Sequence, residues 1–102
     1  MTKKSRVSFK SRVVVWPGDK AAWRFLYMPK SDSAMLRKEF GRLSRGFSSL
    51  PVTATIHKIS WDTSLFYDTR SACYLLPLKA QIRRKAEIDD DDTLTCVIAL
   101  RI

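Results

Sequence analysis

Residue types that carry chemistry or turn the backbone are scarce in this chain of 102 residues. It has one histidine, two cysteines and three glycines. The histidine, His57, has no cysteine or serine next to it in the sequence, so there is no obvious pair of nucleophile and base. Zinc motifs are missing as well. We therefore predict no metal and no cofactor, and we favour a binding role over catalysis.

Long hydrophobic runs are also missing. No segment reaches the roughly eighteen apolar residues of a transmembrane helix. The N-terminus, MTKKSRVSFKSR, has the charge of a signal peptide but not its apolar middle part. We expect a cytoplasmic protein without membrane contact. A hydrophobic content of 45% over this length suits one core, so we expect a single domain over residues 1–102 with residues 1–6 flexible.

Acidic residues are few in the first half of the chain. Residues 1–51 hold 12 Lys and Arg against 3 Asp and Glu, whereas residues 52–102 hold 7 of each kind. The net charge of +9 therefore comes entirely from the first half. Such a balance favours either contact with a polyanion or solubility, and charge alone does not choose between them.

Alternating apolar and polar residues predict strands. We expect strands near residues 7–16, 22–28, 52–57, 61–67, 73–76 and 94–102, with a hairpin turn at Pro17, Gly18 and Asp19. The apolar sides of the first and last strands would be formed by Val7, Phe9, Val13 and Val15 and by Leu94, Cys96, Ile98, Leu100 and Ile102. Cys73 and Cys96 lie among apolar neighbours, which favours buried free thiols over a disulfide.

Two short helices are predicted, each after a proline. In the first, within residues 30–49, Ser31 or Asp32 would cap the N-terminus and Gly41 or Gly46 would end the helix. Its apolar stripe would be Leu36, Phe40 and Leu43. The second, over residues 78–86, would bury Leu78, Ile82 and Ala86, which are four residues apart.

The two halves of the chain repeat one pattern. Tyr27-Met28-Pro29 and Leu76-Pro77 each precede a basic helix, and each helix leads into an alternating strand. Because so short a unit cannot bury its own apolar face, two copies packed about a pseudo-twofold axis make a sensible domain. We therefore predict a mainly β barrel with two short α-helices, built from two pseudo-symmetric strand-helix-strand halves.

Several strings in the chain resemble one family. They are Thr55-Ile56, Trp61-Asp62-Thr63-Ser64-Leu65-Phe66, Tyr74-Leu75-Leu76-Pro77-Leu78-Lys79-Ala80, and Arg83 with Lys85-Ala86-Glu87-Ile88. Together they are similar to the small bacterial domain of unknown function numbered nineteen-oh-five. That resemblance implies a double-split β-barrel, related in shape to the AbrB and MazE swapped-hairpin DNA-binding domains, and it implies no activity or site residues.

The chain departs from this family at two turns. Asp90-Asp91-Asp92 stands where the family usually has Gly-Asp before its last strand, and Thr69-Arg70-Ser71 replaces the usual glycines before the Tyr-Leu-Leu string. The aspartates 89–92 carry the donor type that hard cations prefer. Because contiguous carboxylates point in different directions, we interpret them as a solvated turn that keeps a sheet edge from pairing.

Weak nucleic-acid binding through the basic N-terminal half is the leading functional hypothesis. The candidate residues are Lys3, Lys4, Arg6, Lys10, Arg12, Arg37, Lys38, Arg42 and Arg45. Trp16, Trp23, Tyr27 and Trp61 are of the type that stacks on bases. Because three of these aromatics lie in or beside strands whose faces a small barrel must fill, we favour a place in the core over a stacking surface.

Two other functions stay open. A protein-interaction or oligomerisation module would use exposed sheet edges or an aromatic patch. A small-ligand or enzymatic site would need a pocket in the barrel, for which the candidates are His57, Trp61 and Tyr67.

Overall fold

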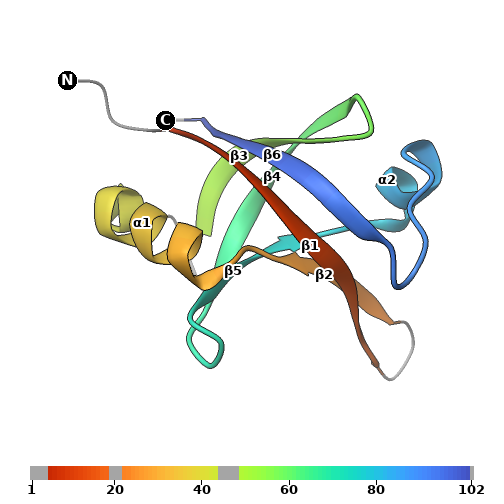
Figure 1. Cartoon of the computed structure of the whole chain (residues 1–102), viewed down its shortest axis with the longest axis horizontal. Helices are drawn as coiled ribbons and strands as arrows, with labels where there is room; N and C mark the ends of the chain where they lie inside the picture. The colour runs from red at the N-terminus through yellow and green to blue at the C-terminus, as the bar shows by residue number, and fades with distance from the viewer. Residues whose placement is uncertain (1–4, 19–21, 44–48, 102) are drawn as a thin grey trace.

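The fold is a closed barrel of six antiparallel strands with a helix at each end (Figure 1). The computed structural model describes residues 5–18, 22–43 and 49–101. The strands are β1 (Arg6–Trp16), β2 (Trp23–Tyr27), β3 (Ser49–Ile56), β4 (Ile59–Asp68), β5 (Cys73–Pro77) and β6 (Thr93–Leu100). The helices are α1 (Lys30–Phe40), which the three-ten helix η1 (Gly41–Leu43) continues, and α2 (Ala80–Lys85). The prediction of a mainly β chain with two helices is confirmed.

The strand order around the barrel is β1-β2-β5-β4-β3-β6, and β6 pairs with β1 to close it. Exchanging β1 with β4, β2 with β5 and β3 with β6 leaves this set of neighbours unchanged. In this exchange β2 and β3, which flank α1, take the places of β5 and β6, which flank α2. Because the barrel is closed, each of the described strands has a neighbouring strand on both sides, which leaves the aromatic patch as the surface that an interaction module would use.

β1 is long because it has two partners. Arg6 to Arg12 pair with β6, and Val13 to Trp16 pair with β2. Val15 has the parity of the inward residues but is exposed, so its assignment to the apolar side was wrong. Since β6 no longer accompanies β1 at this point, Val15 projects beyond the end of the core.

The barrel interior is filled by side chains from all six strands. Leu26, Leu50, Ile56, Leu76 and Ile98 are at most 1% exposed, and Tyr74 is the largest side chain that is fully buried. Helix α1 adds Leu36 and Phe40 from one end, and Ala86 and Ile88 after α2 are buried with the same cluster. The inward alternation predicted for residues 52–56 is confirmed.

Helix α1 begins earlier than predicted. Its N-cap is Pro29, whose carbonyl accepts the Ser33 N–H at 2.9 Å, and no side chain caps it, so the predicted cap by Ser31 or Asp32 is wrong. Gly41 ends the α-helix as predicted. The tighter winding of η1 rotates Leu43 off the apolar stripe, and Leu43 is 44% exposed. Gly46, the other predicted end, lies outside the described residues.

Helix α2 is shorter than predicted. The Leu78 N–H still bonds to the Arg24 carbonyl at 2.9 Å, so the chain stays in register with β2 until Lys79. At the other end, the Ile88 and Glu87 N–H groups bond to the Arg83 and Arg84 carbonyls, and Glu87 has φ 54°. This is a Schellman ending with glutamate in the left-handed position that usually holds glycine. Ile82, predicted to be buried, is half-buried.

The two cysteines lie on strands that are not neighbours, Cys73 on β5 and Cys96 on β6, and both are free thiols, as predicted. Burial raises the pKa of Cys96 to about 12. In a Cys73→Ser variant at about pH 8, we therefore expect a thiol-specific reagent to label Cys96 only after unfolding, since the thiolate is the reactive form. Absorbance of the released leaving group measures this labelling. Fast labelling of the native chain, with an unchanged circular dichroism spectrum, would contradict the burial of Cys96.

Candidate functional site

The strongest candidate for a binding surface is the outside of β1, β2, β5 and β4. Its origin is visible in β5, where four consecutive residues from Cys73 to Leu76 are buried. A strand buried on both faces needs a second apolar layer outside the barrel. That layer is formed by five aromatic side chains, Trp16, Trp23, Phe25, Tyr27 and Phe66, which we call the outer aromatic face.

The register of the strands brings these aromatics together. Trp16 pairs with Trp23, Phe25 with Pro77, and Phe66 with Leu75. All of them are on the side opposite to the buried residues of their strands. Leu75 is only 5% exposed although it points away from the barrel interior, because the aromatic layer covers it. The face is therefore part of the packing as well as a surface.

Three of the five aromatics remain open to solvent. Trp23 is 64% exposed, Phe66 40% and Trp16 39%. The prediction that Trp16, Trp23 and Tyr27 lie in the core is wrong, because the alternation of β1 and β2 places their side chains outside the barrel. Trp61, in contrast, is half-buried and packs against the core.

Trp16 is held in place by its neighbours. Its Nε1 donates a hydrogen bond to the Tyr27 hydroxyl at 3.0 Å. Its ring centroid lies 4.8 Å from that of Phe25 and 6.4 Å from that of Tyr27, with tilted planes. Tilted contacts at these separations are favourable for aromatic pairs. One side of the outer aromatic face is thus fixed, while Trp23 has the larger exposed surface.

A hollow of about 670 Å³ opens over this face. Its floor includes Phe25, Leu75 and Pro77, and its rim carries the cations Lys79 and Arg101. Arg101 is 3.6 Å from a carboxylate oxygen of Asp62, which also accepts a hydrogen bond from Thr53. Among the described residues, Lys79 has no carboxylate within ion-pair distance. The hollow thus combines aromatic surface with an unpaired positive charge.

The acidic turn lies beside Trp23 of this face, and two of its exposed aspartates make ion pairs with the barrel. Arg24 donates two hydrogen bonds to the Asp90 carboxylate, at 2.8 and 3.1 Å, and Arg12 is 3.2 Å from Asp91. The hydrogen bond from Arg24 lowers the pKa of Asp90. Two of the aspartates therefore anchor the loop before β6 to β1 and β2. The interpretation as a solvated turn is confirmed, since Asp89, Asp90 and Asp91 are exposed, and the ion pairs are an addition to it.

The basic residues predicted to bind nucleic acid that the structure describes lie on two elements, β1 and the α1 side. Lys3, Lys4 and Arg45 lie outside the described residues. On β1, Arg6, Lys10 and Arg12 point outward, and on the α1 side Arg37, Lys38 and Arg42 are exposed. Two of the six have protein partners, since Arg12 pairs with Asp91 and the Arg37 guanidinium lies 3.9 Å from the centre of the Tyr67 ring.

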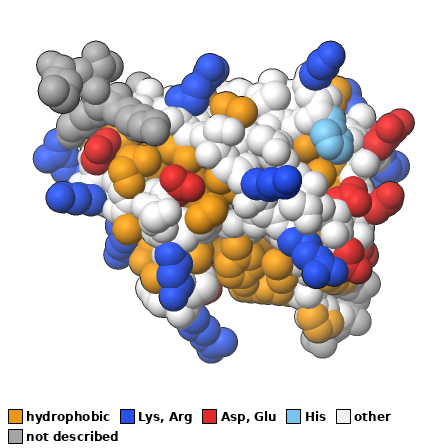
Figure 2. Space-filling model, in the orientation of Figure 1, with side chains coloured by type: hydrophobic (Ala, Val, Ile, Leu, Met, Phe, Trp, Pro, Cys, Tyr) orange, Lys and Arg blue, Asp and Glu red, His pale blue; other side chains and the backbone are white. Residues whose placement is uncertain are grey.

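The view in Figure 2 shows how these charges are distributed on one face. Basic side chains lie at the left edge, at the top and near the centre, and acidic side chains lie at the right, with others at the left. Hydrophobic side chains are exposed below the centre of the same view. On this face, the basic residues do not form one continuous stripe.

The three predicted pocket residues are not brought together. His57 occupies a two-residue turn with Lys58, in which both have positive φ, and its Nδ1 is 2.8 Å from the Ala86 carbonyl oxygen after α2. Tyr67 contacts Tyr74 edge-on near α1 at the other end of the barrel. Trp61 and Tyr67 are separated by six residues of one strand, roughly 20 Å. Among the described residues, no three of His, Cys, Asp and Glu are placed to hold a metal ion.

Fold and surface together define a small antiparallel β-barrel with an exposed aromatic face outside the barrel. The model for the family described as Domain of unknown function (DUF1905) matches residues 9–98. The chain belongs to this family, and the resemblance found in the sequence is confirmed. No curated protein matches the chain. In the part of the chain that the structure describes, no helix has the length and hydrophobicity to cross a membrane.

Sequence reasoning missed Phe25, Phe66, Lys79 and Arg101 as candidate site residues. One signal was available. The apolar run of β5 predicts burial on both faces. Trp23, Phe25 and Tyr27 alternate along one strand, which indicates that their shared side could cover the outer face of β5. The alternation pattern could not identify Arg101. This residue follows β6 and reaches the hollow only because β6 pairs with β3.

Proposed function

We propose that this domain is a non-enzymatic binding module that binds nucleic acid weakly and without sequence specificity. The observation that carries the proposal is the outer aromatic face, where exposed indole and phenyl rings lie beside the unpaired Lys79. Rings that stack on bases, together with cations that contact phosphates, are the two components of sequence-independent binding to nucleic acid.

The charge distribution supports the same proposal in a secondary way. The net charge of +9 attracts polyanions at long range. On β1, the exposed Lys10 and Trp16 both point away from the barrel interior. The same strand therefore carries a cation of the N-terminal half and one ring of the outer aromatic face. The finer interpretation of the fold as a double-split barrel of two related halves is also a proposal, supported by the equivalent strand positions.

Fluorescence anisotropy of a labelled oligonucleotide, titrated with the protein at several salt concentrations, tests the proposed function. With roughly four phosphate contacts, we expect the affinity for a single strand to fall about fiftyfold between about 50 and 200 mM salt. A Lys10→Glu variant, which reverses one exposed charge, should bind more weakly if the N-terminal half contributes. Absence of binding at the lowest salt would remove the proposal.

A second candidate function is protein interaction or self-association through the outer aromatic face. It is favoured by Trp23, whose 64% exposed indole is an unusual amount of free aromatic surface. Light scattering over a range of protein concentrations separates the two functions. A concentration-dependent dimer that a Trp23→Ala substitution abolishes would favour self-association.

A further inference from the structure

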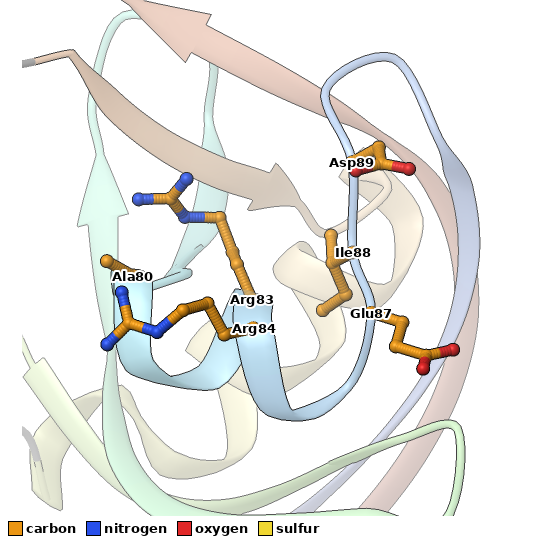
Figure 3. Close-up of a pocket in the computed structure, with 6 residues that line it drawn as sticks. All are labelled: Ala80, Arg83, Arg84, Glu87, Ile88 and Asp89. Atoms are coloured by element: carbon orange, nitrogen blue, oxygen red, sulfur yellow. The ribbon is translucent and has the colours of Figure 1, made fainter.

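The hollow over the outer aromatic face is one of four hollows that form a row. It shares Trp16 with a hollow of about 510 Å³ that also contacts Tyr27 and Arg70. On the other side it shares Trp23 and Lys79 with one of about 250 Å³. The hollow of about 250 Å³ shares Arg83 with a fourth hollow of about 380 Å³, which lies beside α2 and is shown in Figure 3. We call this row the outer groove.

From this arrangement we propose that the outer groove binds one unpaired nucleic-acid strand, with bases held between the side chains that divide the hollows. This inference rests on the proposed function and names its substrate class and its path over the surface. The dividing side chains are two indoles, Trp16 and Trp23, and the guanidinium of Arg83. Planar aromatic and guanidinium groups are the side chains on which bases stack, because every base has a π-face.

The charges along the outer groove complement a phosphate backbone. Lys79 borders both central hollows, and Arg83 and Arg84 border the hollow beside α2. Figure 3 shows the guanidinium ends of Arg83 and Arg84 extending to one side of α2, while the carboxylates of Glu87 and Asp89 point away from them. The Arg83 Nε also donates to the Leu78 carbonyl at 3.1 Å, which fixes the direction of this side chain.

Two carboxylates that border the outer groove, Asp62 and Asp68, are already engaged. Asp62 accepts a hydrogen bond from Thr53 and pairs with Arg101, and Asp68 accepts hydrogen bonds from the Ser71 hydroxyl and N–H. The hydrogen bond from the Ser71 hydroxyl lowers the pKa of Asp68. Lys79, which borders the same hollow as Asp62, has no such partner among the described residues. A polyanion that follows the groove therefore meets uncompensated cations more often than free carboxylates.

An unpaired strand fits these features better than a duplex or a single nucleotide. In a duplex the base faces are stacked on one another and cannot contact Trp23. A single nucleotide would fill one hollow and leave the others open. Four hollows with one base each correspond to roughly four nucleotides, the lower end of the site sizes of small barrels that bind single strands.

The test compares a labelled oligothymidine with a duplex of equal length, by anisotropy at constant low salt. The wild-type chain should bind the single strand more tightly. A Trp23→Ala variant should lose about tenfold or more of that affinity, the effect of one lost base stack, whereas a Trp23→Phe variant should stay within about threefold of the wild type. Thermal unfolding of each variant checks that the exposed residue is not needed for folding.

Two lysines provide a matched control for charge. Lys79→Ala and Lys38→Ala each remove one exposed cation, but only Lys79 borders the outer groove. Lys79→Ala should weaken binding of the single strand and reduce the slope of log K against log salt by about 0.7, and Lys38→Ala should leave both nearly unchanged.

The outcomes separate the inference from the function on which it rests. If duplex and single strand bind equally and Trp23→Ala has no effect, the domain binds nucleic acid but the outer groove is not the site. If neither nucleic acid binds at low salt, the proposed function fails as well. A dimer that Trp23→Ala dissociates, without any strand binding, would show that a second copy of the chain occupies the face and would overturn the inference.

Discussion

Truncating Leu76 to alanine is expected to lower the free energy of unfolding by about 3 kcal/mol, within a range of roughly 2–5 kcal/mol. Leu76 is fully buried on the inner side of β5, where it pairs with Leu26 of β2. Both faces of β5 are covered, so the surrounding side chains cannot collapse easily into the space that the substitution leaves. A loss of this size is a large part of the roughly 5–15 kcal/mol that stabilises an ordinary domain.

Urea unfolding followed by circular dichroism measures this loss. The midpoint should fall while the dependence on urea stays unchanged, since the surface exposed on unfolding is nearly the same. Leu43→Ala is the matched control, because it removes the same atoms from a side chain that is 44% exposed, and it should change stability by at most about 0.5 kcal/mol. Equal effects of the two substitutions would contradict the placement of Leu76 in the core.

The Ser33→Ala substitution should cost about 1–3 kcal/mol through a different mechanism, the loss of a buried polar bridge. The Ser33 hydroxyl donates to the Met28 carbonyl at 3.2 Å and accepts from the Tyr74 N–H at 2.9 Å. The bridge ties the first turn of α1 to β5. Alanine leaves the Tyr74 N–H buried without this acceptor.

Ser31→Ala is the control for this prediction. It makes the same chemical change two residues earlier, at an exposed position that makes no side-chain cap of α1. We expect it to stay within about 0.5 kcal/mol of the wild type in the same urea experiment. If Ser31→Ala were the more damaging change, the helix would be capped as its sequence alone suggests, and the structure of its first turn would be wrong.

Ser33 illustrates why some features follow from sequence and others do not. Alternation in residues 52–56 predicts the inward face of β3, because one buried face imposes a period of two. The helix start is different. Ser31 and Asp32 are good capping residues in isolation, but Pro29 already provides the carbonyl for the first helical bond, and Ser33 is used for a contact with β5, more than forty positions along the chain.

The candidate site shows the same limit. Trp23 and Phe25 have the parity of one strand face, which sequence reveals, but whether that face lies inside or outside depends on what covers β5. The row of hollows also needs residues from β2, β4, β5 and α2, and only the closed strand order brings these together. Composition could therefore suggest binding to a polyanion, but it could not locate the surface.

The meeting of the two ends of the described chain has a consequence for larger architectures. The Leu100 N–H donates to the Ser5 carbonyl at 2.9 Å, and the start of β1 and the end of β6 lie together at the upper left of Figure 1, away from the other end of β1, where it pairs with β2. A fold whose entry and exit coincide can be inserted into a loop of a host polypeptide without stretching it. In such a fusion the host would attach on the side opposite that end of β1 and leave Trp23 unobstructed.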